Sequence, residues 1–408
     1  MTAPPPLWRN RDFVLLQSGQ LFSTAGTQAT QIAYPLLVLA LTHSPSRAGV
    51  VGFASVVPYA LFALFAGVAV DRWNRRMLML TADGARIAAI GSLVAALAVD
   101  RVTFVHITIV AFVEGTAFVF FNIAEVGALR SVVPTAQLPD AAAAEQARFA
   151  TVTLVGPSAG GALFGLGRAL PFVADLASYA FSIVSLLLIR TPFQETRIAD
   201  TASMRAQIAE GFRWLWGQPF LRTCAIIFAG ANFMFAGIFL TFIVTAKRHG
   251  ISSGGIGVCI ALFGASALAG SFVAPFINRT LSMRGIVVVN LWLNVAIVAF
   301  VLVPNVYVLL AATVPVAFFI PAGNAAIIGY RTAVTPDRLI GRVSSVARNI
   351  ALLAQPLGPL AAGFLLGATS PRLTVLAFTI VSAALALWGT LSPSIRRAPS
   401  LTELAEPA

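Results

Sequence analysis

The stretch that decides the fold is residues 130–161, RSVVPTAQLPDAAAAEQARFATVTLVGPSAGG, which recurs in outline at residues 331–363, RTAVTPDRLIGRVSSVARNIALLAQPLGPLAAG. Each copy runs from an arginine through a proline, a leucine and a second arginine to a Gly-Pro pair and a later glycine. The matching positions lie 200 to 202 residues apart: Arg130 and Arg331, Pro134 and Pro336, Leu138 and Leu339, Arg148 and Arg348, Gly156-Pro157 and Gly358-Pro359, Gly161 and Gly363. In a chain of 408 residues, a half-length repeat between long apolar runs predicts a membrane transporter built from two similar halves.

Composition also indicates an integral membrane protein. Apolar residues make up 58% of the chain and charged residues only 10%, against roughly 25% charged in soluble domains. A spanning helix needs about 20 predominantly apolar residues, and twelve segments qualify: Phe13–Leu41, Ala48–Val70, Met77–Val99, Thr103–Val133, Ala141–Gly167, Leu170–Ile189, Phe220–Ala246, Ile251–Ile277, Gly285–Val303, Val306–Val334, Gly341–Ala368 and Leu373–Leu391. The prediction is an all-α membrane protein with twelve transmembrane helices in two pseudo-symmetric six-helix bundles.

The basic residues predict the orientation of the chain. The net charge is +12 with 27 Lys and Arg, which would suggest nucleic acid in a soluble protein. Here all but six of them fall on one side of the predicted membrane, as the positive-inside rule expects of the cytoplasmic side. The six on the other side are Arg47, Arg101, Arg168, Lys247, Arg248 and Arg372. We therefore expect a multi-pass plasma-membrane protein with both termini cytoplasmic, anionic lipid as a partner, no nucleic-acid partner and no removable signal peptide.

The predicted organisation has three parts. Residues 1–190 form the first bundle, residues 191–218 a cytoplasmic linker, and residues 219–408 the second bundle with a short cytoplasmic tail. Within the linker, apolar side chains recur at helical spacing from Met204 to Leu215, which predicts an amphipathic helix. It could lie on the inner membrane surface or pack on the cytoplasmic ends of the spans. We expect a monomer.

The loop after the second span carries the most specific local motif. Gly67, Asp71, Arg72, Arg75 and Arg76 form G-x-x-x-D-R-x-x-R-R, which resembles the signature of the major facilitator superfamily in the same loop. The resemblance extends over the whole chain. It implies that Asp71 meets the start of the eleventh span near Gly341, close to Arg130, because a helix N-terminus favours negative charge. Such a contact would be a cytoplasmic latch between the halves. The simpler interpretation is that the charges of this loop only set the topology of the chain.

The fifth span adds a second motif. Gly156, Pro157, Gly160 and Gly161 form G-P-x-x-G-G, which is similar to the pattern of antiporting exporters in this superfamily. Proline removes a backbone donor and permits a kink, and glycines allow another helix to approach closely. The motif is therefore interpreted as a gate, although simple helix packing would use the same residues. Gly358-Pro359 is its partner in the eleventh span.

Further phrases narrow the resemblance to one branch. Leu7 to Phe13 (LWRNRDF), Gly19 to Leu21 (GQL), Glu210 to Arg213 (EGFR) and Thr335 to Val343 (TPDRLIGRV) look like the branch with macrolide efflux proteins and the enterobactin exporter. That branch implies export of an amphipathic small molecule, such as an antibiotic, a siderophore or another secondary metabolite. A drug-like efflux substrate and multidrug resistance follow as expectations.

Polar residues inside the spans are candidates for the substrate cavity. Lipid tolerates such residues poorly, so they should face a cavity or another helix. The first span carries a stripe at i, i+4, i+7 and i+11, and the second half has four counterparts: Gln20, Thr24, Thr27 and Gln31, with Asn232, Asn324, Asn349 and Gln355. Taken singly, each is as readily explained by a helix-to-helix hydrogen bond.

Glu114 is the candidate for proton coupling. It lies 11 residues into the fourth span, roughly 16 Å from its outer end at about 1.5 Å per residue. Apolar surroundings disfavour the charged form of a carboxylate, so alternating exposure could load and release a proton. Glu114 could instead anchor a cationic substrate, be satisfied by polar neighbours, or pair with an arginine such as Arg348.

Several alternatives stay open. Ala111 and Thr27 stand where the family often has arginine and where exporters often have aspartate, so a sodium-coupled or uncoupled facilitator or importer remains possible. A non-transporting receptor would not need the latch or the gate. No nucleophile with a base and no metal constellation occurs at mid-span, which argues against an enzyme, a cofactor and a metal site.

Overall fold

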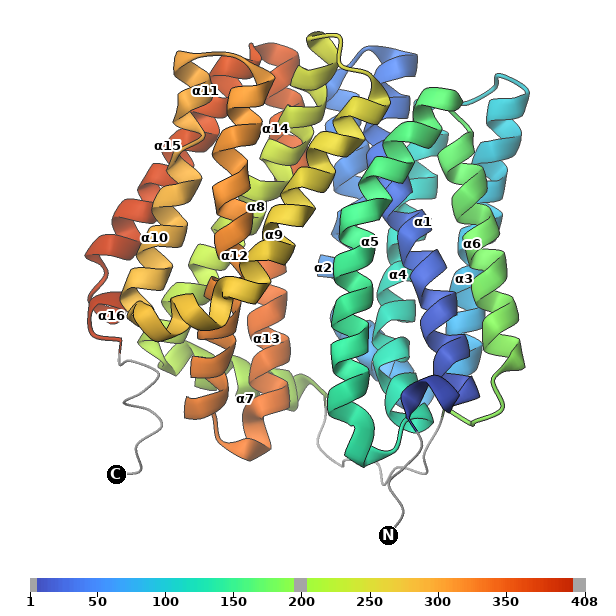
Figure 1. Cartoon of the computed structure of the whole chain (residues 1–408), viewed down its shortest axis with the longest axis horizontal. Helices are drawn as coiled ribbons and strands as arrows, with labels where there is room; N and C mark the ends of the chain where they lie inside the picture. The colour runs from blue at the N-terminus through green and yellow to red at the C-terminus, as the bar shows by residue number, and fades with distance from the viewer. Residues whose placement is uncertain (1–5, 194–203, 399–408) are drawn as a thin grey trace. The chain divides into compact units, whose positions relative to one another are not determined.

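The computed structural model describes residues 6–193 and 204–398, and it leaves undescribed the side chains of residues 64, 68, 71, 204 and 205. Every regular element in these ranges is helical (Figure 1). The chain divides into two compact units. One contains Met1–Ala199 together with Ile251–Ala261, and the other contains Asp200–Gly250 together with Leu262–Ala408.

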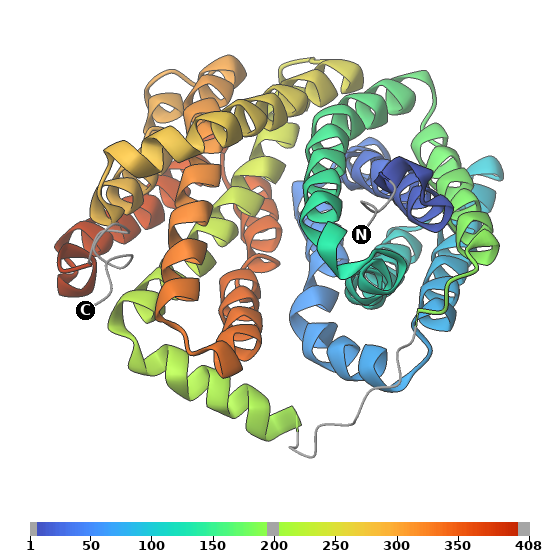
Figure 2. The ribbon, with the colours of Figure 1, turned by 60° about the horizontal axis from the view of Figure 1, so that its bottom comes forward.

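The first bundle consists of six long helices. They are α1 (Arg11–Thr42), α2 (Pro45–Arg72), α3 (Arg75–Ala98), α4 (Phe104–Val132), α5 (Leu138–Leu166) and α6 (Leu170–Leu188), with 3₁₀ turns at Leu7–Arg9 and Thr135–Gln137. Helix α1 packs on α5 and α6, whereas α4 packs on α2 and α3. Figure 2 looks toward one end of this bundle and lets the reader follow these pairs. The core includes Leu16, Met79, Phe121 and Leu186, each nearly or fully buried. The arrangement turns α1, α3, α4 and α6 toward a shared interior.

The second unit holds the linker helix and the remaining spans. Its elements are α7 (Met204–Gly217), α8 (Pro219–Arg248), most of α9 (Ser253–Thr280), α10 (Met283–Val295), α11 (Val298–Leu302), α12 (Val306–Val334), a 3₁₀ turn at Asp337–Leu339, α13 (Ile340–Leu353), α14 (Leu357–Ala368), α15 (Pro371–Leu391) and α16 (Pro393–Arg396). Helix α8 packs on α12, α13, α14 and α15. Cys224, Ile286, Ala326 and Val343 belong to its core.

The twelve predicted spans are confirmed. Eleven helical segments of the described chain are long and apolar enough to cross a membrane. The twelfth span is α1, a continuous helix of 32 residues that is absent from this group. Its sequence, with Gln17, Gln20, Gln28 and Gln31, explains the difference, because polar side chains lower the mean hydropathy of a helix that faces protein on several sides.

Two spans predicted as single helices are broken. The ninth span is α10 followed by α11, and the eleventh is α13 followed by α14. In the eleventh, Pro356 and Pro359 lack the amide hydrogen that a continuous helix needs. Instead, the Leu352 carbonyl accepts from the Gln355 amide at 3.2 Å, and the Gln355 carbonyl accepts from the Gly358 amide at 3.1 Å. Each donor lies three residues after its acceptor, one fewer than in an α-helix. The Gly-Pro pair of the second half therefore lies beside a real interruption, whereas α5 continues through Pro157.

Candidate functional site

A buried polar cluster lies inside the first bundle, centred on Glu114 of α4. The Tyr34 hydroxyl of α1 donates to Glu114 Oε2, and the Tyr179 hydroxyl of α6 donates to Glu114 Oε1 at 3.0 Å. The three side chains are 5%, 4% and 0% exposed. Buried polar groups need hydrogen-bond partners, and two phenols give Glu114 one donor for each oxygen.

Asp175 of α6 joins the same cluster. The Thr30 hydroxyl lies 3.1 Å from Asp175 Oδ2 and 3.4 Å from Glu114 Oε1, so it bridges the two carboxyl groups. Gly26 makes this approach possible, because a Cβ at that position would lie 2.3 Å from Asp175 Oδ1. Asp175 is completely buried. Sequence analysis did not connect Asp175 with Glu114.

Two ion pairs lie within the same bundle. Arg86 of α3 donates to Asp83 Oδ1 at 3.1 Å, and both side chains are almost fully buried. The Arg86 guanidinium also stacks over the ring of Tyr179, with 5.0 Å from Cζ to the centroid. Arg148 of α5 donates to Glu125 of α4 at 2.8 Å. Buried charges persist in proteins when they are paired in this way.

The charges of the bundle interior do not balance. Four carboxyl groups and two guanidinium groups lie there, and the two ion pairs use both cations. Glu114 and Asp175 are left with hydroxyl partners and no cation within 4.0 Å among the described residues. Because an isolated buried charge is costly, at least one of these two groups is best accommodated as the neutral acid.

The polar stripe of α1 does not form one uniform surface. Thr27 points into the cluster, 2.9 Å from the Tyr179 hydroxyl, and Gln20 is buried. Thr24 is partly exposed and Gln31 is exposed. At least Thr27 thus makes the helix-to-helix hydrogen bond that was the alternative to cavity lining.

The four polar candidates of the second unit are also separated. Asn232 donates to the carbonyl of Ala351 at 3.0 Å, next to the break in the eleventh span. Asn349 donates to the carbonyl of Ser345 in its own helix at 2.9 Å. Asn324 is exposed, and Gln355 lies between α13 and α14. Asn232 therefore satisfies a carbonyl whose own helix ends two residues later.

The loop motif has well-defined partners within the first bundle. Arg75 donates to the carbonyl of Phe193 at 3.0 Å. Arg76 donates to the carbonyl of Leu187 at 3.0 Å and to those of Leu186 and Ile189. Cations at a helix C-terminus are favourable because its last carbonyls lack partners. These arginines therefore fasten the start of α3 to the end of α6.

The latch itself stays a prediction. Asp71 lies in the last turn of α2, but its side chain is outside the described residues. Arg72, Arg130 and Gly341 are exposed. At Gly67 a Cβ would meet nothing within 4 Å, so packing of the described side chains does not explain this glycine.

The Gly-Pro motifs are sites of close helix packing. A Cβ on Gly160 would lie 2.5 Å from the Ala29 carbonyl oxygen of α1, and Gly156, Pro157 and Gly161 are buried as well. In the second unit, a Cβ on Gly358 would lie 2.3 Å from the carbonyl oxygen of Phe233 in α8. The glycine that corresponds to Gly358 in the repeat is Gly156, and a Cβ there would lie 2.6 Å from Gln28 Cβ of α1. Corresponding helices thus meet in the two bundles at the paired glycines. Gating by these residues stays a prediction.

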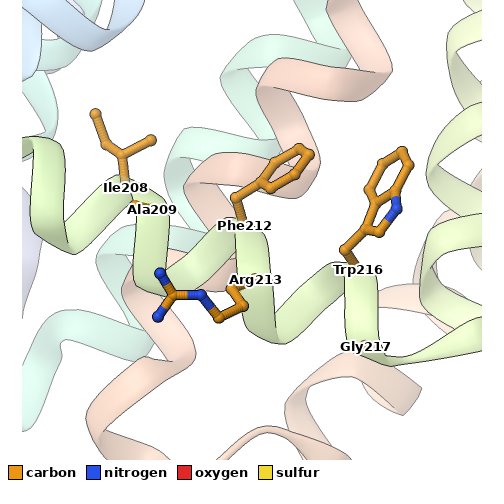
Figure 3. Close-up of a pocket in the computed structure, with 6 residues that line it drawn as sticks. All are labelled: Ile208, Ala209, Phe212, Arg213, Trp216 and Gly217. Atoms are coloured by element: carbon orange, nitrogen blue, oxygen red, sulfur yellow. The ribbon is translucent and has the colours of Figure 1, made fainter.

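The linker helix α7 is docked on the second unit. Glu210 accepts from Arg338 at 3.0 Å and also from Arg342. Leu215 is fully buried in the core. A hollow on the outer face is lined by Ile208, Ala209, Phe212, Arg213, Trp216 and Gly217 (Figure 3). The rings of Phe212 and Trp216 stack there with centroids 5.0 Å apart. The helix therefore packs on the spans with one face, while Phe212 and Trp216 on its other face stay exposed among the described residues.

The phrase at the start of the chain ties α1 to α4 and to the segment that follows α6. Asn10 donates to the carbonyl of Val132 at 2.9 Å. Asp12 accepts from the hydroxyl and amide of Thr191 at 2.6 and 2.8 Å and from the amide of Arg190 at 3.2 Å. Burial acts to raise the pKa of Asp12, but these hydrogen bonds and the charge of Arg11 outweigh it, so the pKa lies below its usual value.

Sequence reasoning missed most of the residues around Glu114. Thr30, Tyr34 and Tyr179 were not singled out. A signal existed in the sixth span, where polar residues recur at i, i+3, i+4 and i+7: Asp175, Ser178, Tyr179 and Ser182. Such a stripe marks one helix face, and the structure turns it toward α1 and α3.

Two bundles of membrane-spanning helices, with ionisable groups enclosed in one of them, define a multi-pass membrane transporter of the secondary type. The Major Facilitator Superfamily profile matches residues 17–299. The chain belongs to that family, whose members are transporters and not enzymes.

Known relatives and solved structures agree with this family. The chain is 27% identical over 402 residues to the multidrug efflux pump Tap of Mycolicibacterium fortuitum, with 94% of this chain and 96% of that protein covered. It is 22% identical to the uncharacterized MFS-type transporter YkuC of Bacillus subtilis, with 86% and 84% covered. In fold it is similar to a bacterial homologue of the human lysosomal transporter Spinster, with a TM-score of 0.76, 15% identity and coverage of 98% and 99%. A bacterial homologue of the iron transporter ferroportin gives a TM-score of 0.73 at 14% identity, with 95% and 100% covered.

Proposed function

We propose that this transporter exports an amphipathic small molecule across the plasma membrane in exchange for protons, by alternating access of a central cavity. The direction is supported by the multidrug efflux pump that the chain resembles along its whole length. It is also supported by the complete G-P-x-x-G-G of the fifth span. The branch containing macrolide efflux proteins and the enterobactin exporter makes an antibiotic, a siderophore or another secondary metabolite the expected substrate.

Proton coupling rests on one observation, the pair of buried carboxyl groups without a cation. Glu114 is 5% exposed and accepts hydrogen bonds from Tyr34 and Tyr179. Asp175 lies beyond the bridging Thr30 hydroxyl. A group that can bind a proton and is kept from water is what coupling by alternating exposure requires. We propose Glu114 as the coupling residue.

The test is pH-driven efflux from cells that carry the gene, with ethidium and a macrolide as probes. Wild type should lose each probe faster than cells without the gene, and a protonophore should abolish the difference. Glu114→Gln should reduce pH-driven efflux at least tenfold. The matched control is Asp140→Asn, which neutralises an exposed carboxyl in the first turn of α5 and should leave efflux unchanged.

Three outcomes would count against the proposal. Unchanged pH-driven efflux in Glu114→Gln would remove that residue from coupling. Efflux that ignores the protonophore but follows a sodium gradient, or follows no gradient, would favour the sodium-coupled or uncoupled facilitator. Equal retention of many amphipathic probes with and without the gene would reject export.

The remaining assignments complete the proposal. Asp71, together with Arg130 and the helix start at Gly341, would form the cytoplasmic latch. The Gly-Pro pairs of the fifth and eleventh spans would be the gate. Gln20, Asn324 and the other polar candidates would line the cavity, apart from Thr27 and Asn232, whose side chains bond to neighbouring helices. Both termini would be cytoplasmic and the protein would work as a monomer.

A further inference from the structure

The hydrogen bonds around Glu114 and Asp175 distinguish the two carboxyl groups. Glu114 has an O–H donor for each oxygen, from Tyr34 and Tyr179. Such donors stabilise a carboxylate in its charged form. The surroundings of Glu114 are therefore those of an anion.

Asp175 lacks a comparable set of donors. The Ser178 hydroxyl is 3.2 Å from Asp175 Oδ1, but it is 2.7 Å from the Asp175 carbonyl, which is the shorter of the two contacts. The Thr30 hydroxyl has one hydrogen, and it lies within bonding distance of Asp175, Glu114 and two carbonyls of its own helix. Since each hydroxyl donates once and can also accept, Asp175 is better satisfied when it donates a proton to Thr30 or Ser178.

The charged surroundings agree with one proton on the pair. The ionisable groups facing it are contributed by three helices: Tyr34 from α1, Arg86 from α3, and Tyr179 from α6. Asp83 of α3 is the ion-pair partner of Arg86. Arg86 interacts electrostatically with both carboxyl groups while it is paired with Asp83. Helix α5 has no charged residue between Phe149 and Leu166, and between Ala48 and Val70 α2 has one ionisable residue, Tyr59. A single negative charge on Glu114 is thus supported by two phenol donors and the nearby Arg86, whereas a second charge on Asp175 would have no such donors and would share the same cation.

We propose that Glu114 and Asp175 form one proton-binding unit, which at rest holds a single proton on Asp175 and the negative charge on Glu114, with Thr30 as the relay between them. The transfer balances. The proton leaves Asp175 Oδ2 for Thr30 Oγ1 as the Thr30 hydrogen moves to Glu114 Oε1, which leaves Asp175 charged, Glu114 neutral and the hydroxyl restored. This inference rests on the proposed proton coupling, since it names the residues that hold and pass the coupled proton.

Infrared difference spectroscopy of the purified full chain in lipid at neutral pH locates the proton without any substrate. A protonated carboxylic acid has a carbonyl stretch that a carboxylate lacks. Asp175→Asn should remove an acid band from the wild-type spectrum, because asparagine imitates the neutral state. Glu114→Gln should remove carboxylate absorption and retain the acid band. Loss of the acid band in Glu114→Gln with its retention in Asp175→Asn would overturn the assignment.

The relay is tested separately by transport. Thr30→Val should slow pH-driven ethidium efflux at least tenfold, and Thr30→Ser, which keeps the hydroxyl, should restore it. Thr241→Val is the matched control, since Thr241 is fully buried in α8 and its hydroxyl donates to the carbonyl of Gly237 in the same helix at 2.8 Å. Wild-type efflux in Thr30→Val would overturn the relay. If even the wild type lacks pH-driven efflux, the proposed coupling fails, whereas the infrared result still decides where the proton resides.

Discussion

Gly160 provides the sharpest test of the helix packing. In Gly160→Ala the new Cβ would lie 2.5, 2.6 and 2.9 Å from the carbonyl oxygen, Cα and carbonyl carbon of Ala29, whereas ordinary contact begins at 3.4 Å. All three are backbone atoms, so no side-chain rotation relieves the contact, and α5 and α1 must separate by about 1 Å. Overpacking of this kind costs about 1 to 3 kcal/mol.

Gly84→Ala is the matched control, because a Cβ there would meet nothing within 4 Å. Replacing glycine inside a helix favours the fold by up to about 1 kcal/mol. Both variants share this gain, so they should differ by the overpacking cost of about 1 to 3 kcal/mol. The measurement is the thermal unfolding midpoint of the purified protein in one detergent, followed by tryptophan fluorescence. Gly160→Ala should unfold at a clearly lower temperature than wild type and Gly84→Ala at the same or a higher one. Equal midpoints for the two alanine variants would refute the packing argument.

Two further predictions concern the ends of the spans. Asp12→Asn should destabilise the protein by about 1 to 2 kcal/mol at neutral pH, since hydrogen bonds to the charged carboxylate are lost. The pKa of Asp12 is lowered in the folded protein, so the extra stability of wild type over Asp12→Asn is fully present above the unfolded pKa of about 3.9. It disappears as the pH falls through the folded pKa. A stability difference that persists below the folded pKa would contradict the prediction. Glu210→Gln should weaken the docking of α7 by about 1 kcal/mol and raise amide hydrogen exchange in α7 roughly fivefold. Asp337→Asn is the charge-matched control. Equal exchange in both variants would show that the ion pairs of Glu210 do not hold the helix.

Much of the fold could be predicted from the sequence because each membrane span can be recognised from consecutive residues alone. Each span is an apolar run of known length, and the repeat fixes how many there are in each half. The predicted eleventh span was too simple, since it was a single helix with Gly358-Pro359 as the partner of a kink-permitting motif, and the structure has a break there. A break leaves other carbonyls without their helical donors, and Asn232 of α8 satisfies one of them, that of Ala351, from 119 residues away. Such a partner has no local signature.

The candidate site was predicted only in part for the same reason. Glu114 could be singled out because depth along a helix follows from residue number. Its partners could not, since Thr30 and Asp175 lie 84 and 61 positions away, and only the packing of α1 on both α4 and α6 brings the three together. Gly26 shows how little signal such packing leaves, because one missing side chain in α1 decides whether Asp175 reaches the cluster.

The asymmetry between the two halves extends to their acidic residues. From Pro219 to Ala398 the sequence contains one, Asp337, in the 3₁₀ turn before α13. The buried polar side chains of the second unit are hydroxyl groups, which do not titrate near neutral pH. Any coupling through a membrane-embedded carboxylate therefore has to use the first bundle. The repeat supplies the same helices and the same Gly-Pro packing to both halves, so the means of moving is common to them. The membrane-embedded carboxyl groups are confined to one, so under carboxylate coupling the second half would respond to protonation only through movement of the first.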